Sequence, residues 1–161
     1  MIDKRKVLDL LVAHLEEQLR MAEASQQAAQ AGATHPEAKQ EDPKDTRAIE
    51  GQYLARGLAE RVESLRESLA RCRRLEAKPF ADDDPVAVGA ALTVENDAGE
   101  TEHYFVSPWA AGERFRVGSD EVRIVSPQAP LGAALCGQRL DDAIEVEIGG
   151  RVRSLAIVWI G

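Results

Sequence analysis

Residues 34–47 read THPEAKQEDPKDTR, and this stretch separates two long helical patterns. It contains Pro36 and Pro43, the two prolines of the first 78 residues. Four carboxylates also fall within nine positions of the stretch: Glu37, Glu41, Asp42 and Asp45. Because proline cannot continue a helix and acids are common in turns, the stretch predicts a polar turn. The chain should run out along one helix, turn here and return along a second, with the acids at the tip.

The sequence on each side of the turn has the spacing of an amphipathic helix. Over residues 3–31, apolar side chains recur at steps of three and four: Leu8, Leu11, Leu15, Leu19 and Ala22. Asp3 is placed to cap the start of this helix. Over residues 46–77, the steps are those of a coiled-coil seam: Leu58, Val62, Leu65, Leu69 and Cys72. We therefore predict an antiparallel helical hairpin over residues 1–78, with arms of about 45 Å at ~1.5 Å per residue.

The remainder of the chain has the pattern of a small sheet. Residues 79–85, PFADDDP, break the helical period and predict a linker. Beyond it we expect five or six strands, one short helix and tight turns at residues 96–99 and at Gly149-Gly150. The expected strands are 86–94, 102–106, 114–117, 122–125, 143–148 and 152–160, and the helix is 129–135. The fold class is therefore α+β, a helical hairpin followed by a small antiparallel-sheet domain over residues 86–161.

Composition and charge exclude several classes of protein. No apolar run is long enough to cross a bilayer, and residues 1–14 lack the apolar centre of a signal peptide. Cys72 and Cys136 each lie in an apolar pattern, so we expect reduced core thiols and a cytoplasmic location. Residues 1–78 hold 14 basic and 14 acidic residues, whereas residues 79–161 hold 6 and 14. This acidic second half argues against direct binding along a nucleic-acid backbone and favours a basic patch on a protein partner.

Other candidate sites in the sequence carry little signal. His14, His35 and His103 lie in different predicted elements without a second His or Cys nearby, which argues against a zinc site. The run of Asp82, Asp83 and Asp84 is interpreted as a solvated linker rather than a metal site. The sequence contains no nucleophile-elbow motif and no Ser/His/Asp spacing typical of hydrolases.

Residues 126–142, SPQAPLGAALCGQRLDD, resemble the C-terminal signature of the bacterial Gre transcript-cleavage factors. That signature has a serine-proline start, a short Gly/Ala-rich helix, an Ala-Leu-x-Gly end and an acidic pair before the next strand. The flanks agree, with Val88-Gly89-Ala90 before it and residues 145–150, EVEIGG, after it. Ala129 departs from the signature, because the family commonly has serine there. The resemblance extends to the whole architecture, since Gre factors have a long N-terminal helical hairpin and a C-terminal FKBP-like domain.

The resemblance implies a monomeric accessory factor that binds RNA polymerase and is not itself an enzyme. The FKBP-like domain would dock at the rim of the polymerase's secondary channel, and the hairpin would enter the channel. Contact with nascent RNA would be indirect, and no membrane would be involved. The partner-binding residues implied by the signature are Ser126, Pro127, Pro130, Leu131, Gly132, Leu135 and Gly137.

The resemblance also implies a role for the acids at the tip. In the family, such acids help to hold a second Mg²⁺ in the polymerase active site, where backtracked RNA is cleaved. Asp42 and Asp45 are the first candidates for this catalytic and metal-binding role, and Glu41 is the next. The free protein would hold no cofactor, and Mg²⁺ would be shared with the polymerase. After the second acid the family continues with Asn-Ala-Glu-Tyr, where this chain has Thr46-Arg47-Ala48-Ile49.

Three functions stay open at this point. The chain is a cleavage-stimulating Gre factor, a Gre-like regulator that occupies the channel without stimulating cleavage, or a coiled-coil adaptor. The adaptor would dimerise through the seam of residues 58–72. If the tip acids have no part in cleavage, Asp45 only caps the second helix and the other acids keep the turn soluble.

Overall fold

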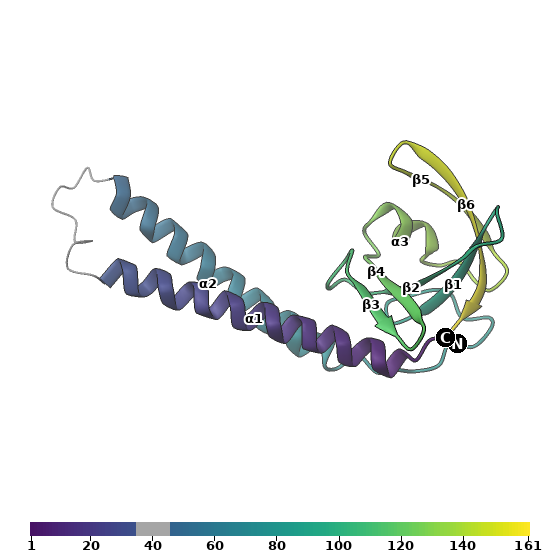
Figure 1. The fold of residues 1–161 in the computed structure, drawn as a ribbon, viewed down its shortest axis with the longest axis horizontal. Coiled ribbons are helices and arrows are strands. Elements are labelled where there is room, and N and C mark those ends of the chain that lie inside the picture. The colour runs from purple at the N-terminus through teal and green to yellow at the C-terminus, as the bar shows by residue number, and fades with distance from the viewer. Residues whose placement is uncertain (35–45) are drawn as a thin grey trace. The chain divides into compact units, whose positions relative to one another are not determined.

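The computed structural model describes residues 1–34 and 46–161 (Figure 1). The predicted tip acids Glu37, Glu41, Asp42 and Asp45 lie outside the described residues. The helices and strands are α1 (Lys4–Thr34), α2 (Thr46–Cys72), β1 (Ala91–Asn96), β2 (Thr101–Val106), β3 (Arg114–Val117), β4 (Asp120–Val125), α3 (Pro130–Leu135), β5 (Ala143–Ile148) and β6 (Arg151–Ile160). A pair of long helices followed by a sheet with one short helix confirms the predicted fold class.

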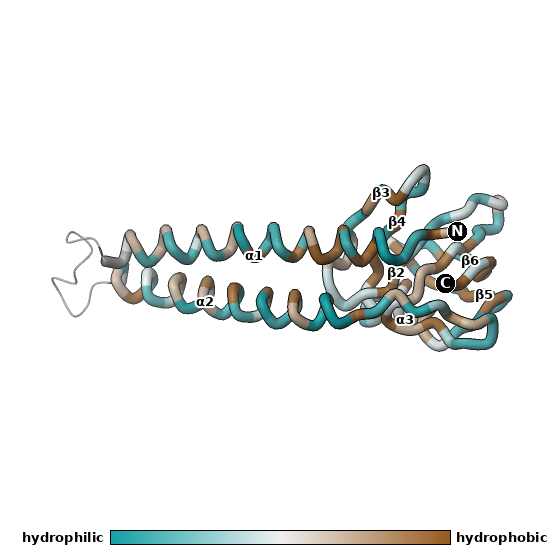
Figure 2. The backbone as a smooth tube through the Cα atoms, turned by 90° about the horizontal axis from the view of Figure 1, so that it is seen from below, coloured by the Kyte–Doolittle hydropathy of each residue, from teal (hydrophilic) through white to brown (hydrophobic). Residues whose placement is uncertain are grey.

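The two long helices bury seven of the ten side chains that their spacing predicts, and Leu19, Leu58 and Leu65 are half-buried. Leu15 and Ala22 of α1 are buried, and so are Val62 and Leu69 of α2. Figure 2 shows apolar and polar segments alternating along both helices, as expected for helices with one buried face. An ion pair joins the helices where Arg66 Nη2 lies 2.8 Å from Glu23 Oε1.

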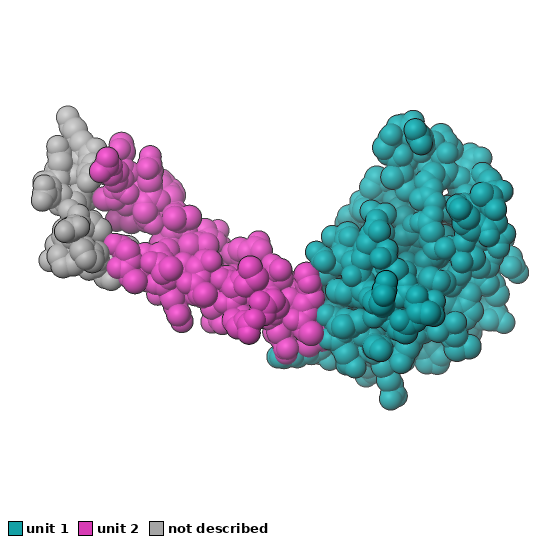
Figure 3. Space-filling model, in the orientation of Figure 1, with its two compact units in different colours: residues 1–11, 72–161 teal, residues 12–71 magenta. Residues whose placement is uncertain are grey.

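The contacts divide the chain into two compact units, residues 12–71 and residues 1–11 with 72–161 (Figure 3). The first turns of α1 therefore belong to the same unit as the sheet. The predicted linker, residues 79–85, lies within that unit, where the Asp84 carboxylate accepts a hydrogen bond of 2.8 Å from the Ala81 amide. Asp3 caps α1 as predicted, because its carboxylate accepts a hydrogen bond of 3.2 Å from the Lys6 amide.

Lys4 fastens the start of α1 to the segment that follows α2. Lys4 is only 9% exposed, and its ammonium group donates a hydrogen bond to the Lys78 carbonyl oxygen. The same nitrogen lies 4.6 Å from the centre of the Phe80 ring, within the range of a cation–π interaction. Burial lowers the pKa of this ammonium group below its ordinary value.

The sheet has six strands in the order β3-β4-β2-β1-β6-β5 and is mixed rather than wholly antiparallel. Strands β2 and β4 are parallel, with Phe105 beside Ile124 and Val106 beside Val125. This corrects the predicted antiparallel sheet. The physical reason lies in the path of the chain. After β2 the chain passes through residues 107–113 into β3 and then turns back into β4. Strand β4 lies between β3 and β2 in the sheet and runs in the same direction as β2.

One face of the sheet is covered by α3 and carries the core. Leu131 and Leu135 of α3 are buried there among side chains from several strands. The strand residues of this cluster are Leu92, Val94, Tyr104, Val106, Val125, Ile144, Val146, Leu155, Ile157 and Ile160. They alternate with residues that face the other way, as the period of a strand requires. The buried members of this cluster are aliphatic apart from Tyr104, and Phe80 packs against them. Phe105 is also fully buried but is not part of the cluster.

Two boundaries differ by five residues from those that the sequence predicts, and these are the largest differences. The first strand begins at Ala91 rather than at residue 86, because Gly89 has a φ of +91° and the Ala90 amide bonds back to the Ala87 carbonyl at 3.0 Å. Helix α2 ends at Cys72 rather than at residue 77. Just after this end, the Leu75 amide donates a hydrogen bond of 3.0 Å to the Cys72 carbonyl. The predicted turn at 96–99 is present, and its Gly99 has a φ of +79°.

Candidate partner-docking site

The sheet unit has a pocket of about 380 Å³ beside the start of α3, which we call the docking pocket. Its walls come from the end of β4, the start of α3, the loop before β3 and the tip of the β5–β6 hairpin. Its lining residues are Ala111, Gly112, Arg123, Ile124, Val125, Ser126, Ala129, Pro130, Leu131, Glu147, Ile148 and Gly149. Most of these residues are apolar or small, as is usual for a site that takes an apolar element of a partner.

A tight turn at Ser126 forms the wall between β4 and α3. The Ser126 hydroxyl donates a hydrogen bond of 2.6 Å to the Gln128 side-chain carbonyl and accepts one of 3.2 Å from the Gln128 amide. The Ser126 carbonyl accepts a further bond of 3.0 Å from the Ala129 amide. These hydrogen bonds fix the turn and place Pro130 at the first position of the helix. Proline has no N–H, and at this position no N–H is needed for the hydrogen bonds of the helix.

Helix α3 packs against this turn through a glycine. A Cβ added to Gly132 would lie 1.9 Å from the Ser126 carbonyl oxygen and 2.7 Å from its carbonyl carbon. Only a residue without a side chain fits at this distance. Ala129 is the N-cap of α3 and provides no side-chain hydrogen bond to the helix, so the serine that the family commonly has there would be a better cap.

The end of α3 and the acidic pair after it serve the fold. Gly137 has a φ of +86°, and its amide bonds the Val86 carbonyl at 2.8 Å. Asp141 has a φ of +68°, a conformation that Asp tolerates better than most residues. The Asp142 carboxylate accepts a bond of 2.7 Å from the Arg139 amide, and its carbonyl accepts one of 2.9 Å from the Ile157 amide. These acids therefore shape the turn that leads into β5.

A second pocket of about 440 Å³, the polar pocket, lies alongside β2 and the β3–β4 hairpin. It is lined by Thr101, Glu102, His103, Tyr104, Arg114, Ser119, Asp120, Glu121 and Arg123. Arg123 of β4 is the residue that this pocket shares with the docking pocket. Its side chain is exposed, whereas its neighbours Val122 and Ile124 are buried.

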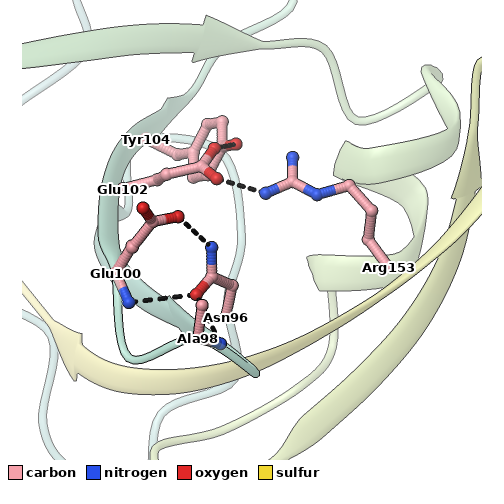
Figure 4. A network of polar contacts seen from close by, with 6 residues as sticks. All are labelled: Asn96, Ala98, Glu100, Glu102, Tyr104 and Arg153. Carbon is pink, nitrogen blue, oxygen red and sulfur yellow. Dashed lines mark hydrogen bonds and ion pairs between the residues drawn. The ribbon is translucent and has the colours of Figure 1, made fainter.

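The polar pocket adjoins a network around Glu102 (Figure 4). The carboxylate of Glu102 accepts hydrogen bonds from the Tyr104 hydroxyl and from the Arg153 guanidinium. Burial on its own would raise the pKa of Glu102, but these bonds and the charges of Arg153 and Arg123 together hold that pKa below its usual range. Burial and the bond to Glu102 raise the pKa of Tyr104 to about 12. In the same figure, Asn96 shapes the β1–β2 turn by accepting bonds from the Ala98 and Glu100 amides.

The residues that the sequence suggests for partner binding fall into two sets. Ser126, Pro130 and Leu131 line the docking pocket. Pro127, Gly132, Leu135 and Gly137 do not line it and instead build α3 and its connections. The tip acids Glu41, Asp42 and Asp45 lie outside the described residues. Within residues 1–34 and 46–161, no group of three or more His, Cys, Asp or Glu side chains is arranged to hold a metal ion.

The sequence-based predictions name three of the twelve residues that line the docking pocket and miss the other nine. The pocket is also lined by residues from elements that are far apart in the chain, namely Arg123, Ile124, Ile148 and the loop at Ala111-Gly112. The alternation in β4 predicts that Arg123 faces solvent, but it carries no information about which other element lies nearby.

The two cysteines are free, as expected, and burial raises the pKa of the Cys72 thiol to about 11. No helix in the described ranges is both long and apolar enough to span a membrane.

Comparison with known proteins identifies the family. The family described as "Transcription elongation factor, GreA/GreB, C-term" matches residues 81–161. The transcription elongation factor GreB of Pasteurella multocida is 34% identical over 131 residues, which cover 68% of this chain and 75% of that protein.

Several solved structures of Gre-related proteins are also similar. The GreA factor homolog 1 protein of Thermus thermophilus has 20% identity and a TM-score of 0.38 over 93% of this chain and 94% of that one. The GreA/GreB factor of Nitrosomonas europaea has 22% identity and a TM-score of 0.36 over 63% of this chain and 90% of that one. Family membership rests on the family match and on the GreB relative. The chain belongs to the GreA/GreB family of transcription elongation factors.

Proposed function

We propose that this elongation factor binds RNA polymerase at its secondary channel through the docking pocket. The observation that carries the proposal is that the family match, residues 81–161, contains every residue that lines the pocket. The Ser126 turn and α3, which carry the family's signature, form one wall of it. The largely apolar lining and the rigid turn offer a preformed surface for an apolar element of the polymerase.

We further propose that the hairpin tip assists the polymerase in cleaving backtracked RNA. In the sequence, Asp45 directly precedes Thr46, the first residue of α2, and Asp42 stands four positions before Thr46. Carboxylate oxygens of this kind suit Mg²⁺, which prefers hard oxygen ligands and keeps several waters. When bound in the polymerase, Mg²⁺ would activate the attacking water and stabilise the leaving oxygen. The part of this chain is then to supply one or two carboxylates to a site that the polymerase completes.

A second candidate is a regulator that occupies the channel without stimulating cleavage. The observation in its favour is the departure of Thr46-Arg47-Ala48-Ile49 from the residues that follow the second acid in the family. The coiled-coil adaptor has less support. Val62 and Leu69, two of the five seam residues, are 2% and 5% exposed within the single chain and so are not open to a second copy.

The experiment is transcript cleavage in a stalled, backtracked elongation complex. We expect wild type to accelerate cleavage and Asp42→Ala/Asp45→Ala to lose most of that effect while still binding the polymerase. The control is Asp82→Ala/Asp83→Ala, which removes the same two charges from an exposed segment of the other unit and should cleave like wild type. Binding without any cleavage by wild type would favour the regulator, and absence of binding would rule out both candidates.

A further inference from the structure

Arg123 stands at the border of the docking pocket and the polar pocket, with its side chain exposed. Among the described residues it is the single basic residue in the lining of the docking pocket. The strands around it hold further arginines, and two of these, Arg114 and Arg153, have ion-pair partners.

Two neighbouring arginines on the same face of the sheet are neutralised by carboxylates. Arg114 lies opposite Arg123 in the β3–β4 register, and its Nη1 lies 3.0 Å from Glu121 Oε1. Arg153 of β6 is bonded to Glu102. The Arg123 guanidinium forms no hydrogen bond or ion pair with any residue in the described parts of the chain. Its charge acts on Glu102 from a distance, but the oxygens of that carboxylate already accept bonds from Arg153 and Tyr104.

The cross-strand position of Arg123 carries a cost for the fold. Like charges directly opposite each other in a sheet are destabilising, and Arg114 and Arg123 form such a cross-strand pair. A residue that makes an unfavourable like-charge pair, and has no hydrogen bond or ion pair to offset it, is expected at a functional site. The cation is also unusual in its surroundings, because residues 79–161 hold only 6 basic residues against 14 acidic ones.

We propose that Arg123 is a specificity-determining residue of the docking pocket and pairs with a carboxylate side chain of the docked RNA polymerase. This inference rests on the function proposed above. An apolar partner element seated on Ile124, Val125 and Leu131 would exclude water from one side of the guanidinium. Under those conditions a bidentate arginine–carboxylate pair is strong and directional, so it fixes the register of the partner as well as adding affinity. The partner element therefore carries an acidic residue at the edge of its apolar surface.

The test measures the affinity of the full-length protein for core RNA polymerase by equilibrium competition. The variants are Arg123→Glu, Arg123→Gln and Arg123→Lys. The matched control is Arg116→Glu, which reverses an exposed arginine on the adjacent strand that lines neither pocket. We expect Arg123→Glu to weaken binding about tenfold or more, Arg123→Gln to weaken it less, and Arg123→Lys to retain part of the affinity. Arg116→Glu should bind within about twofold of wild type.

Salt dependence separates an ion pair from a merely structural role. We expect the affinity of Arg123→Gln to fall less steeply with salt than that of wild type, while the melting temperatures of the two remain similar. The inference is overturned if Arg123→Glu binds as tightly as Arg116→Glu, or if the salt dependence is unchanged by Arg123→Gln. In either case, wild-type binding would leave the proposed function standing. Absence of wild-type binding would instead overturn the proposed function, and this inference with it.

Discussion

Gly132 of α3 lies so close to Ser126 that a Cβ on the glycine would stand 1.9 Å from the serine's carbonyl oxygen. The contact joins the helix to the turn that precedes it and leaves no room for adjustment, because both partners are backbone atoms. Ser126 in turn orders Gln128 and Ala129 through its hydroxyl and carbonyl groups. One wall of the docking pocket therefore depends on residue 132 being glycine.

The first prediction concerns this contact. Gly132→Ala should destabilise the sheet unit by about 3 kcal/mol, because the added methyl group forces α3 away from Ser126. Chemical denaturation followed by circular dichroism measures the change. Gly57→Ala is the control, since nothing lies within 4 Å of its added Cβ and the glycine is inside α2. That substitution should stabilise the protein by about 0.5–1 kcal/mol, and equal effects of the two variants would contradict the account.

The second prediction concerns the N-cap of α3. Ala129→Ser should raise the free energy of unfolding by about 1 kcal/mol, because the serine hydroxyl can accept a bond from a free amide in the first turn. Thermal and chemical unfolding both measure the gain. Ala133→Ser, a substitution at an exposed position within the same helix, should be neutral or slightly destabilising. The account would be wrong about this cap if Ala129→Ser gave no gain over Ala133→Ser.

The third prediction concerns alkaline pH. The pKa of Cys72 is raised to about 11 and that of Tyr104 to about 12 in the folded chain, from ordinary values of 9.0 and 10.0. Both groups must stay protonated in the fold, whereas the unfolded chain releases their protons earlier. The free energy of unfolding should therefore fall as the pH rises from about 9 towards about 12. Cys72→Ala/Tyr104→Phe should show a flatter dependence, and an unchanged slope would contradict this assignment.

The fourth prediction concerns acidic pH. The pKa of Glu102 is lowered in the folded chain, so its contribution to stability is present above the ordinary value of 4.5 and is lost as the pH falls through the folded pKa. Glu102→Gln should therefore be less stable than wild type at neutral pH, and the difference should shrink well below pH 4.5. Glu145→Gln on β5, which is exposed and outside the network, provides the control. A difference for Glu102→Gln that did not change with pH would count against the ionised network.

The helical hairpin could be predicted because its signal is local and repeated. Leu8, Leu11 and Leu15 recur every three or four residues, and all three are buried. Strands such as β3 and β5 could be predicted for the same reason, since alternation is visible within a few residues. Strand direction could not, because the pattern of β4 is the same whether it lies parallel or antiparallel to β2. The predicted start of the first strand is too early, because Val86 and Val88 continue its apolar run and only Gly89, with its positive φ, interrupts that run.

The candidate site was predictable only where one continuous segment forms it. Ser126, Pro130 and Leu131 lie on that segment and line the docking pocket. Arg123 and Ile148 reach the same pocket through the order of the strands, which no single segment encodes. Some residues of the signature have a structural role, and Gly132 is the clearest case, because its close contact with Ser126 requires a residue without a side chain.

The central claim is that this chain binds RNA polymerase through the docking pocket, and equilibrium binding to core polymerase tests it most directly. Ile148 and Val152 are both exposed apolar residues near the tip of the β5–β6 hairpin, but only Ile148 is in the pocket lining. The account predicts that Ile148→Asp weakens binding about tenfold or more, whereas Val152→Asp stays within about twofold of wild type. Undetectable binding of wild type, or equal affinities for the two variants, would contradict it.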